Sequence, residues 1–220
     1  SESKNAGQWV ESERYQNLKV KAWPSKLVAK LDFVNGSLNN SINPSEKGKM
    51  KRQHAPKQYP KIVNGHSGEG LELDGDAWLD LDRIGVFKRN QPFSIGIRIK
   101  IPEELENGVI FHKNIGTRLY SYRGYHLALK ENKLEAMLAH VWPDNAIVKL
   151  STQDIPKNKW LQLTMTYDGS SKAEGLKVFL EGEELETKIK VDNLYKDIIY
   201  KHSSEPGLQI GARWRGKGIR

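Results

Sequence analysis

The fold of this chain is decided by residues 158–186, which read NKWLQLTMTYDGSSKAEGLKVFLEGEELE. Apolar residues occupy every second position over 161–167 and again over 176–180. A period of two is typical of a β-strand that turns one face toward a core. The DGSS sequence at 168–171 favours a tight turn, because glycine permits positive φ and aspartate and serine bond to nearby backbone groups. The stretch therefore predicts an antiparallel meander, which a second turn at 181–182 extends into a third strand.

The same residues resemble the central hairpin of laminin-G-like domains. The shared pattern is Trp160, then Tyr-Asp-Gly-Ser seven residues later, then a strand that reads Val-Phe-Leu-x-Gly at 178–182. These domains belong to the concanavalin A-like lectin/glucanase superfamily, whose fold is an all-β jelly-roll sandwich of two antiparallel sheets. The resemblance runs from about residue 27 to residue 219. It implies a laminin-G-like jelly-roll domain at 27–220, preceded by a linker or short helix at 1–26.

Composition is compatible with one β-sandwich and excludes several kinds of chemistry. The 220 residues contain no cysteine, which excludes disulfides, thiol catalysis and zinc–thiolate sites. No run approaches the roughly 18 apolar residues of a membrane-spanning helix, so we expect no membrane insertion. The chain begins at Ser1 without methionine, and we expect a processed protein or a fragment of a longer one.

The net charge of +8 could favour an anionic partner. The densest basic stretch, from Lys47 to Lys61, contains prolines and a glycine and reads as a solvated loop. Binding to nucleic acid would require aromatic residues interleaved with the charge, and only Tyr59 is present there. We therefore expect no nucleic-acid partner.

Alternation elsewhere predicts about a dozen strands, as expected for a sandwich or jelly roll. We expect the first strand at 27–33, followed by a long polar connection at 39–66. The clearest alternation lies at 93–101 and predicts a central strand with five inward apolar residues. The other expected strands are two short ones around Gly75 within 70–81, and then 108–112, 124–130, 134–140, 146–150 and 208–212.

Two motifs in the middle of the chain narrow the resemblance. Residues 123–129 read RGYHLAL, and residues 140–146 read HVWPDNA. With the 158–186 hairpin, they resemble the laminin-G-like insert of large secreted planctomycete-type proteins that also carry cytochrome-c-like domains. This implies a non-catalytic accessory module in an extracytoplasmic (periplasmic or secreted) multidomain protein. The chain has no Cys-x-x-Cys-His motif, so any haem would belong to other domains.

Candidate ligand-binding residues are those suited to sugars, because sugar rings stack on aromatic faces and their hydroxyls pair with charged or amide groups. Such residues gather in three connections of the predicted sandwich. The alternative for each aromatic is packing in the core or at a sheet edge. The predicted ligand-binding residues are Tyr122, Arg123, His140, Trp142, Asp144, Asn145, Arg213 and Trp214. We also expect Trp142 to lie near Arg123 or Tyr122.

The resemblance also implies a calcium site, because many laminin-G-like domains bind calcium at one rim through aspartate side chains and loop carbonyls. The matching metal candidates are Asp32, Asn35 and Asn39. Solvated turn residues are the alternative for all three. The family's closing strand would follow Arg220, and a calcium ligand could be lost with it.

Catalysis is the weaker hypothesis. Glu72, Asp74 and Asp76 would share one face of a strand, which resembles the acidic strand of glucanases in this superfamily. However, aspartate stands where the second glutamate belongs, and Gly75 interrupts the strand. The six histidines show no metal-ligand spacing. We therefore expect no enzyme activity and no catalytic residues.

The sequence thus favours a binding module that recognises a carbohydrate, with an anionic polysaccharide suggested by the charge. The alternative is an architectural domain that packs against neighbouring domains of a larger enzyme. One structural consequence follows from the missing closing strand. The strand at 27–33 should have an unpaired edge, which residues 1–23 or a second molecule would cover as an edge-mediated dimer.

Overall fold

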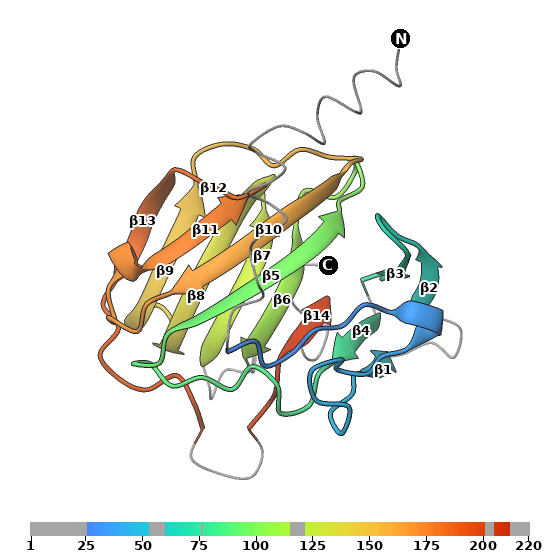
Figure 1. Ribbon diagram of the computed structural model, residues 1–220. Coiled ribbons are helices and arrows are strands. Elements are labelled where there is room, and N and C mark those ends of the chain that lie inside the picture. The colour runs from blue at the N-terminus through green and yellow to red at the C-terminus, as the bar shows by residue number, and fades with distance from the viewer. Residues whose placement is uncertain (1–25, 53–59, 76, 115–121, 201–204, 212–220) are drawn as a thin grey trace, which may run out of the picture.

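The computed structural model describes residues 26–52, 60–75, 77–114, 122–200 and 205–211. Their strands form two antiparallel sheets that face each other, together with a separate hairpin (Figure 1). This arrangement confirms the predicted all-β sandwich of two antiparallel sheets. The expected linker or helix at 1–26 lies outside the described residues except for Lys26.

The larger sheet has eight strands in the order β1-β4-β14-β6-β7-β8-β9-β13. The smaller sheet has the order β12-β11-β10-β5, and β2 pairs with β3 in the separate hairpin. The bounds in chain order are β1 Lys49–Arg52, β2 Lys61–Asn64, β3 Glu69–Glu72, β4 Ala77–Asp80, β5 Phe93–Lys100, β6 Gly108–Asn114, β7 Gly124–Lys130, β8 Lys133–Val141, β9 Asn145–Ser151, β10 Trp160–Tyr167, β11 Leu176–Leu180, β12 Glu183–Glu184, β13 Thr187–Asp192 and β14 Gln209–Gly211. The described helices are two short 3-10 turns, η1 (Val34–Gly36) and η2 (Ala173–Gly175), and none has the length to cross a membrane.

The meander that the sequence predicted is confirmed. β10 pairs with β11 on one side and with β5 on the other, and every second residue of β10 is buried in the core. In the turn after β10, the Ser170 N–H donates to Asp168 Oδ1 at 2.8 Å, and Gly169 has φ of +83°. An added Cβ at Gly169 would lie 2.7 Å from the Asn90 carbonyl oxygen. This turn therefore requires glycine both for its positive φ and for the lack of space.

β5 has the predicted inward face but not the predicted position. Phe93 and Ile101 are buried, whereas Ile95, Ile97 and Ile99 are only half-buried where they pack against the core. The expectation of a central strand is therefore wrong, because β5 forms the edge of the smaller sheet and pairs only with β10. An edge strand lacks a neighbour on one side, which leaves its side chains partly open to solvent.

Residues 27–33 do not form the first strand, and this corrects the prediction. Their alternation is real, since Ala29, Leu31 and Phe33 pack against the core. However, the Lys30 N–H donates to Asn40 Oδ1 at 3.0 Å, and the Lys30 carbonyl accepts from the Ser41 N–H. These bonds go to a loop and not to a strand ladder. The proposed unpaired strand edge at 27–33 is therefore wrong as well, and the dimer through this edge, which stays untested, loses the strand on which it was predicted.

The stretch expected to be one long loop, 39–66, contains β1 and β2. β1 forms an edge of the larger sheet by pairing with β4. The prediction failed because neither strand has a clean apolar alternation: β1 reads KMKR and β2 reads KIVN. Residues 53–59, which include much of the basic stretch, lie outside the described residues.

The larger sheet is buried on both faces in its middle. β7 has six consecutive buried residues, and on β8 the residues Leu134 and Leu138 belong to the core between the sheets. The opposite face carries a second apolar cluster of Met137, Ala139, Ala146 and Val148, with Tyr122 and Val191 packed against it. Strands buried on both faces lose the period of two, which explains the near-continuous apolar runs of β7 to β9.

Candidate functional site: an aromatic rim

The most exposed aromatic side chains among the described residues lie at one end of the sandwich. Trp142 is 46% exposed in the turn between β8 and β9, and Tyr195 is 60% exposed in the segment that follows β13. Large apolar side chains that gather at the surface indicate an interaction site. Aromatic faces in particular can stack against sugar rings. We name the surface formed by residues 142–145 and 193–197 the rim.

Asn145 and Asn193 hold the two segments of the rim together. The buried Asn145 side chain accepts through Oδ1 from the N–H groups of Tyr195 at 3.1 Å and Lys196 at 3.2 Å. The Asn193 side chain donates to the Asp144 carbonyl at 2.8 Å, and its N–H donates to the Ala146 carbonyl. Tyr195 is thereby fixed beside the turn that presents Trp142.

Arg123 and His140 form the base of the rim. They lie next to each other because β7 and β8 pair, with Gly124 opposite Ala139. Arg123 donates through Nε to the His140 carbonyl at 3.1 Å, and its terminal Nη2 lies 3.0 Å from His140 Nε2. Its guanidinium also lies over the Tyr200 ring, 5.2 Å from the ring centroid, which is within the range of a cation–π contact.

These contacts assign the tautomer of His140. A guanidinium can only donate, so His140 Nε2 accepts the bond from Arg123. Nδ1 therefore carries the hydrogen and donates to the Asp197 carbonyl at 2.6 Å. Burial lowers the pKa of His140, the bond to the Asp197 carbonyl opposes this, and the positive charges of Arg123 and Lys196 lower the pKa further. The neutral imidazole is the form that fits both bonds.

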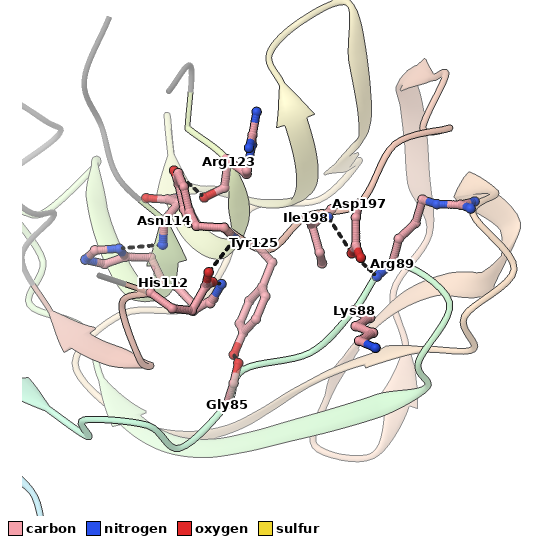
Figure 2. A network of polar contacts seen from close by, with 12 residues as sticks. Gly85, Lys88, Arg89, His112, Asn114, Arg123, Tyr125, Asp197 and Ile198 are labelled. Carbon is pink, nitrogen blue, oxygen red and sulfur yellow. Dashed lines mark hydrogen bonds and ion pairs between the residues drawn. The ribbon is translucent and has the colours of Figure 1, made fainter. Parts of the chain in front are cut away.

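The Asp197 carboxylate ties the rim to the body of the sandwich. Asp197 Oδ1 accepts from the N–H groups of Arg89 at 2.9 Å and Ile198 at 2.8 Å, as Figure 2 shows. In the same view the Tyr125 hydroxyl donates to the Gly85 carbonyl at 2.7 Å. The backbone after β13 is thus anchored immediately next to Lys196 and Tyr195.

A buried ion pair lies below this segment. Lys113 of β6 is fully buried and pairs with the Glu205 carboxylate, which is itself only 16% exposed. Burial lowers the pKa of Lys113 to about 7, the Asp197 carboxylate raises it, and the Arg123 charge lowers it. The second Glu205 oxygen accepts from the Tyr200 N–H. The pair therefore links β6 to both ends of the 200–205 connection.

The structure brings some of the predicted ligand-binding residues together. Arg123, His140, Asp144 and Asn145 belong to the rim or its base, and Trp142 is exposed there. Tyr122 instead packs against the apolar cluster on the outer face of the larger sheet. Arg213 and Trp214 lie outside the described residues. A direct contact of Trp142 with Arg123 or Tyr122 stays a prediction.

The sequence prediction missed Tyr195, Lys196, Asp197 and Tyr200. They follow β13, which was not among the expected strands. The usable signal was the segment NLYKDIIY at 193–200, in which two tyrosines flank a lysine, an aspartate and two isoleucines. Nothing local in that segment indicates that it returns to the β8–β9 turn.

Among the three calcium candidates, the Asp32 side chain has a partner within the protein. The Asp32 carboxylate pairs with Lys30 at 3.0 Å, and Asn35 lies in η1 with φ of 53°. Asn39 forms an isolated bridge with Lys47, and its N–H donates to Ser37 Oγ at 3.2 Å. Among the described residues, no group of three or more histidine, aspartate or glutamate side chains is arranged to hold a metal ion. Calcium binding stays a prediction.

The acidic residues of the glucanase hypothesis do not share a strand. β3 ends at Glu72, and Asp74 lies in the following turn, where its Oδ1 accepts from the Ala77 N–H at 3.0 Å. Gly75 has φ of 90° between β3 and β4. Asp76 lies outside the described residues, so the separation of Glu72 and Asp76 is not assigned.

Comparison with solved structures agrees with the fold. Domain 4 of AbnA, a GH43 extracellular arabinanase from Geobacillus stearothermophilus in complex with arabinotriose, matches with a TM-score of 0.57 and 18% identity. The match covers 89% of this chain and 87% of that chain. The receptor binding domain of botulinum neurotoxin D matches with a TM-score of 0.46 and 12% identity, over 82% of this chain and 49% of that chain. A carbohydrate esterase from the Shiga toxin-encoding bacteriophage phi24B gives a TM-score of 0.40 and 12% identity, over 78% and 84%. No protein-family model matches the sequence, and no curated protein matches it.

Proposed function

We propose that this protein is a non-catalytic carbohydrate-binding module that recognises an anionic polysaccharide at the rim. The observation that carries the proposal is the placement of Trp142 and Tyr195, which are exposed on two segments held side by side by Asn145. An exposed aromatic side chain offers a flat apolar face to a sugar ring at low conformational cost. Rigid support from Asn145 reduces the ordering that binding requires.

The preference for an acidic sugar rests on the charges at the rim. Lys196 is exposed, and its ammonium lies 5.9 Å from the centroid of the Tyr195 ring. A cation beside a stacking face suits a sugar that carries a carboxylate or sulfate group. Arg123 is engaged with His140 and Tyr200, so it supports the base of the rim and is not the first contact for the ligand.

One contact in the structure and one structural neighbour support a binding role over hydrolysis. Asp74, one of the acidic residues considered for catalysis, has a structural role in the turn before β4. AbnA domain 4, which has the same fold, is described with bound arabinotriose. On the resemblance stated above, we place the module in an extracytoplasmic protein with further domains.

Affinity electrophoresis tests the proposal, because a polysaccharide embedded in a native gel retards a protein that binds it. The panel contains neutral polysaccharides, including arabinan, and anionic ones that carry carboxylate or sulfate groups, each with calcium and with a chelator. We expect retardation by an anionic member, and its loss in Trp142→Ala and Tyr195→Ala. Removal of one central aromatic from an interface typically costs about 2 kcal/mol or more, a loss of about thirtyfold in affinity.

Ile189→Ala is the matched control. Ile189 is 54% exposed on β13, so the change removes a comparable apolar surface away from the rim. This variant should be retarded like the wild type. If no anionic polysaccharide retards the wild-type protein, the proposed specificity is wrong. If no polysaccharide of either kind does, the architectural alternative is favoured.

A further inference from the structure

The outer face of the smaller sheet carries a second set of groups suited to a sugar chain. On β10, Trp160, Gln162 and Thr164 are half-buried and alternate with residues of the core. The register places Arg98 beside Gln162, and it places Gly96 and Phe179 on either side of Thr164. We name this surface the platform.

Hydrogen bonds hold the polar groups of the platform in place. Arg98 Nε donates to Gln162 Oε1 at 3.2 Å, and Arg98 Nη1 lies 2.8 Å from His66 Nδ1. The His66 ring meets Trp160 edge-on, with centroids 6.3 Å apart and planes at 85°. The β2–β3 hairpin also reaches this end of the platform, because an added Cβ at Gly70 would lie 3.6 Å from the Trp160 ring.

Gly96 is the second, independent observation. It is exposed in the middle of β5, and its φ is not among the positive values that would require glycine. Glycine weakens a strand interior and often marks a place where a ligand approaches the backbone closely. An added Cβ would lie 3.3 Å from Gln162 Nε2 and 3.6 Å from Thr164 Oγ1, so glycine here leaves space directly beside the two polar groups of β10.

The charged groups around the platform are of both signs: Arg98 and Lys100 of β5 are positive, and Lys177, Glu181 and Glu184 lie on or next to β11 and β12. Lys177 pairs with Glu184 at 2.9 Å, and Glu181 accepts from the Gln162 N–H at 2.7 Å. A surface of aromatic, amide and hydroxyl groups without a dominant charge suits a neutral sugar. Trp160 and Thr164 are four residues apart on β10, which corresponds to about 13 Å at the rise of a β-strand. Phe179 pairs with Thr164, so the two aromatic residues lie at opposite ends of this span. A ligand that contacts both aromatic residues must therefore be a chain and not a single sugar.

We propose that the platform binds an extended neutral polysaccharide chain, independently of the rim. The chain lies along β10, with sugar rings against Trp160 and Phe179. Its hydroxyl groups pair with Gln162, Thr164 and Arg98 over the space left by Gly96. The proposal shares the ligand class of the proposed function but uses a different surface and an uncharged ligand in place of an anionic one.

The variant Gly96→Val tests the platform without damaging the fold. Valine has a higher β-propensity than glycine, but the Gln162 side chain must shift by a few tenths of an ångström against its own hydrogen bonds, so the melting temperature is measured beside binding and should change little. The added side chain fills the space beside Gln162 and Thr164. We expect affinity for the neutral members of the electrophoresis panel to fall about tenfold or more, as expected when a contact at the centre of an interface is blocked.

Ser94→Val is the matched control, because Ser94 is exposed on the same face of β5, two residues away and opposite Thr166. It should keep the binding of wild type. Unchanged neutral binding by Gly96→Val would overturn the platform, as would neutral binding that is lost only in Trp142→Ala, or a wild type that binds no neutral polysaccharide. Retardation by the anionic polysaccharides, and its loss in Trp142→Ala, is measured separately. The proposals for the rim and for the platform can therefore be refuted independently.

Discussion

The Lys113–Glu205 ion pair allows a prediction that depends sharply on pH. The change is Glu205→Gln, which keeps the shape of the side chain and removes its charge. Lys113 is fully buried, and burial lowers its pKa to about 7 even with its neighbours in place. Without the Glu205 carboxylate the ammonium loses its closest opposite charge, so the pKa of Lys113 in the variant should lie lower still.

The size of the effect follows from proton linkage. The folded-state pKa of about 7 lies below the unfolded value of 10.5. Between pH 10.5 and pH 7 the unfolded chain therefore binds more protons than the folded wild type, and the wild type's stability falls as the pH drops from 10.5 to 7. At pH 9 the amine is neutral in both folded proteins, and the variant should lose only about 1 kcal/mol for a weakened hydrogen bond. Below pH 7 the wild type takes up a proton that the variant refuses. The difference then grows by about 1.4 kcal/mol for each pH unit. By pH 5 it reaches at most about 4 kcal/mol, because the Asp197 carboxylate still raises the pKa of Lys113 in the variant, and this upper limit lies within the 3–5 kcal/mol typical of removing one partner from a buried pair.

Urea unfolding at pH 9, 7 and 5, followed by circular dichroism, measures the difference in unfolding free energy. The control is the same Glu205→Gln change made in the Lys113→Met background, where no amine can titrate at this site, so the part of the pH dependence that comes from Lys113 should be absent from the difference between those two proteins. A loss of equal size at all three pH values would show that Lys113 is charged throughout and would refute the reasoning. A loss near zero at pH 5 would show that the pair does not stabilise the fold.

Three further predictions concern the rim and the core below it. Tyr125→Phe should cost about 1–3 kcal/mol in urea unfolding, because the Gly85 carbonyl loses its buried donor. Asn145→Ala should lower the free energy of unfolding by about 1–2 kcal/mol, since the N–H groups of Tyr195 and Lys196 lose their acceptor. It should also weaken binding of the anionic polysaccharide although Trp142 is unchanged. His140 should titrate below 6.5 in an NMR pH series, because its lowered pKa favours the neutral ring in the fold. Its contribution to stability is then complete above pH 6.5 and declines as the pH falls, and His140→Asn should remove that decline.

The sequence predicted those parts of the fold in which local pattern and backbone pairing coincide. The β10–β11 meander is such a case, because alternation, turn residues and strand length all indicate the same hairpin. Residues 27–33 are the opposite case. Their alternation reports correctly which side chains face the core, but it carries no information on whether the backbone bonds to a strand or to Asn40 and Ser41.

The same distinction applies to the rim. Arg123 and His140 could be identified because Arg123 directly precedes β7 and His140 lies on β8, and the short β7–β8 hairpin brings them together. Tyr195 and Asp197 could not be identified, because their position depends on where the chain returns after β13. Asp197, for example, follows His140 by more than 50 residues in the sequence. Likewise, the edge position of β5 follows from the order of strands in the sheet, which its own alternation does not encode.

The most direct test of the central claim is an NMR titration of the tryptophan indole N–H groups with oligosaccharides of the anionic polysaccharide that retards the protein. The Trp142 signal is assigned by its disappearance in Trp142→Phe. If the rim is the binding site, the Trp142 signal shifts with the ligand, and the signal of Trp160 on the platform stays in place. Binding that shifts Trp160 or other signals and leaves Trp142 unchanged would contradict the assignment of the rim.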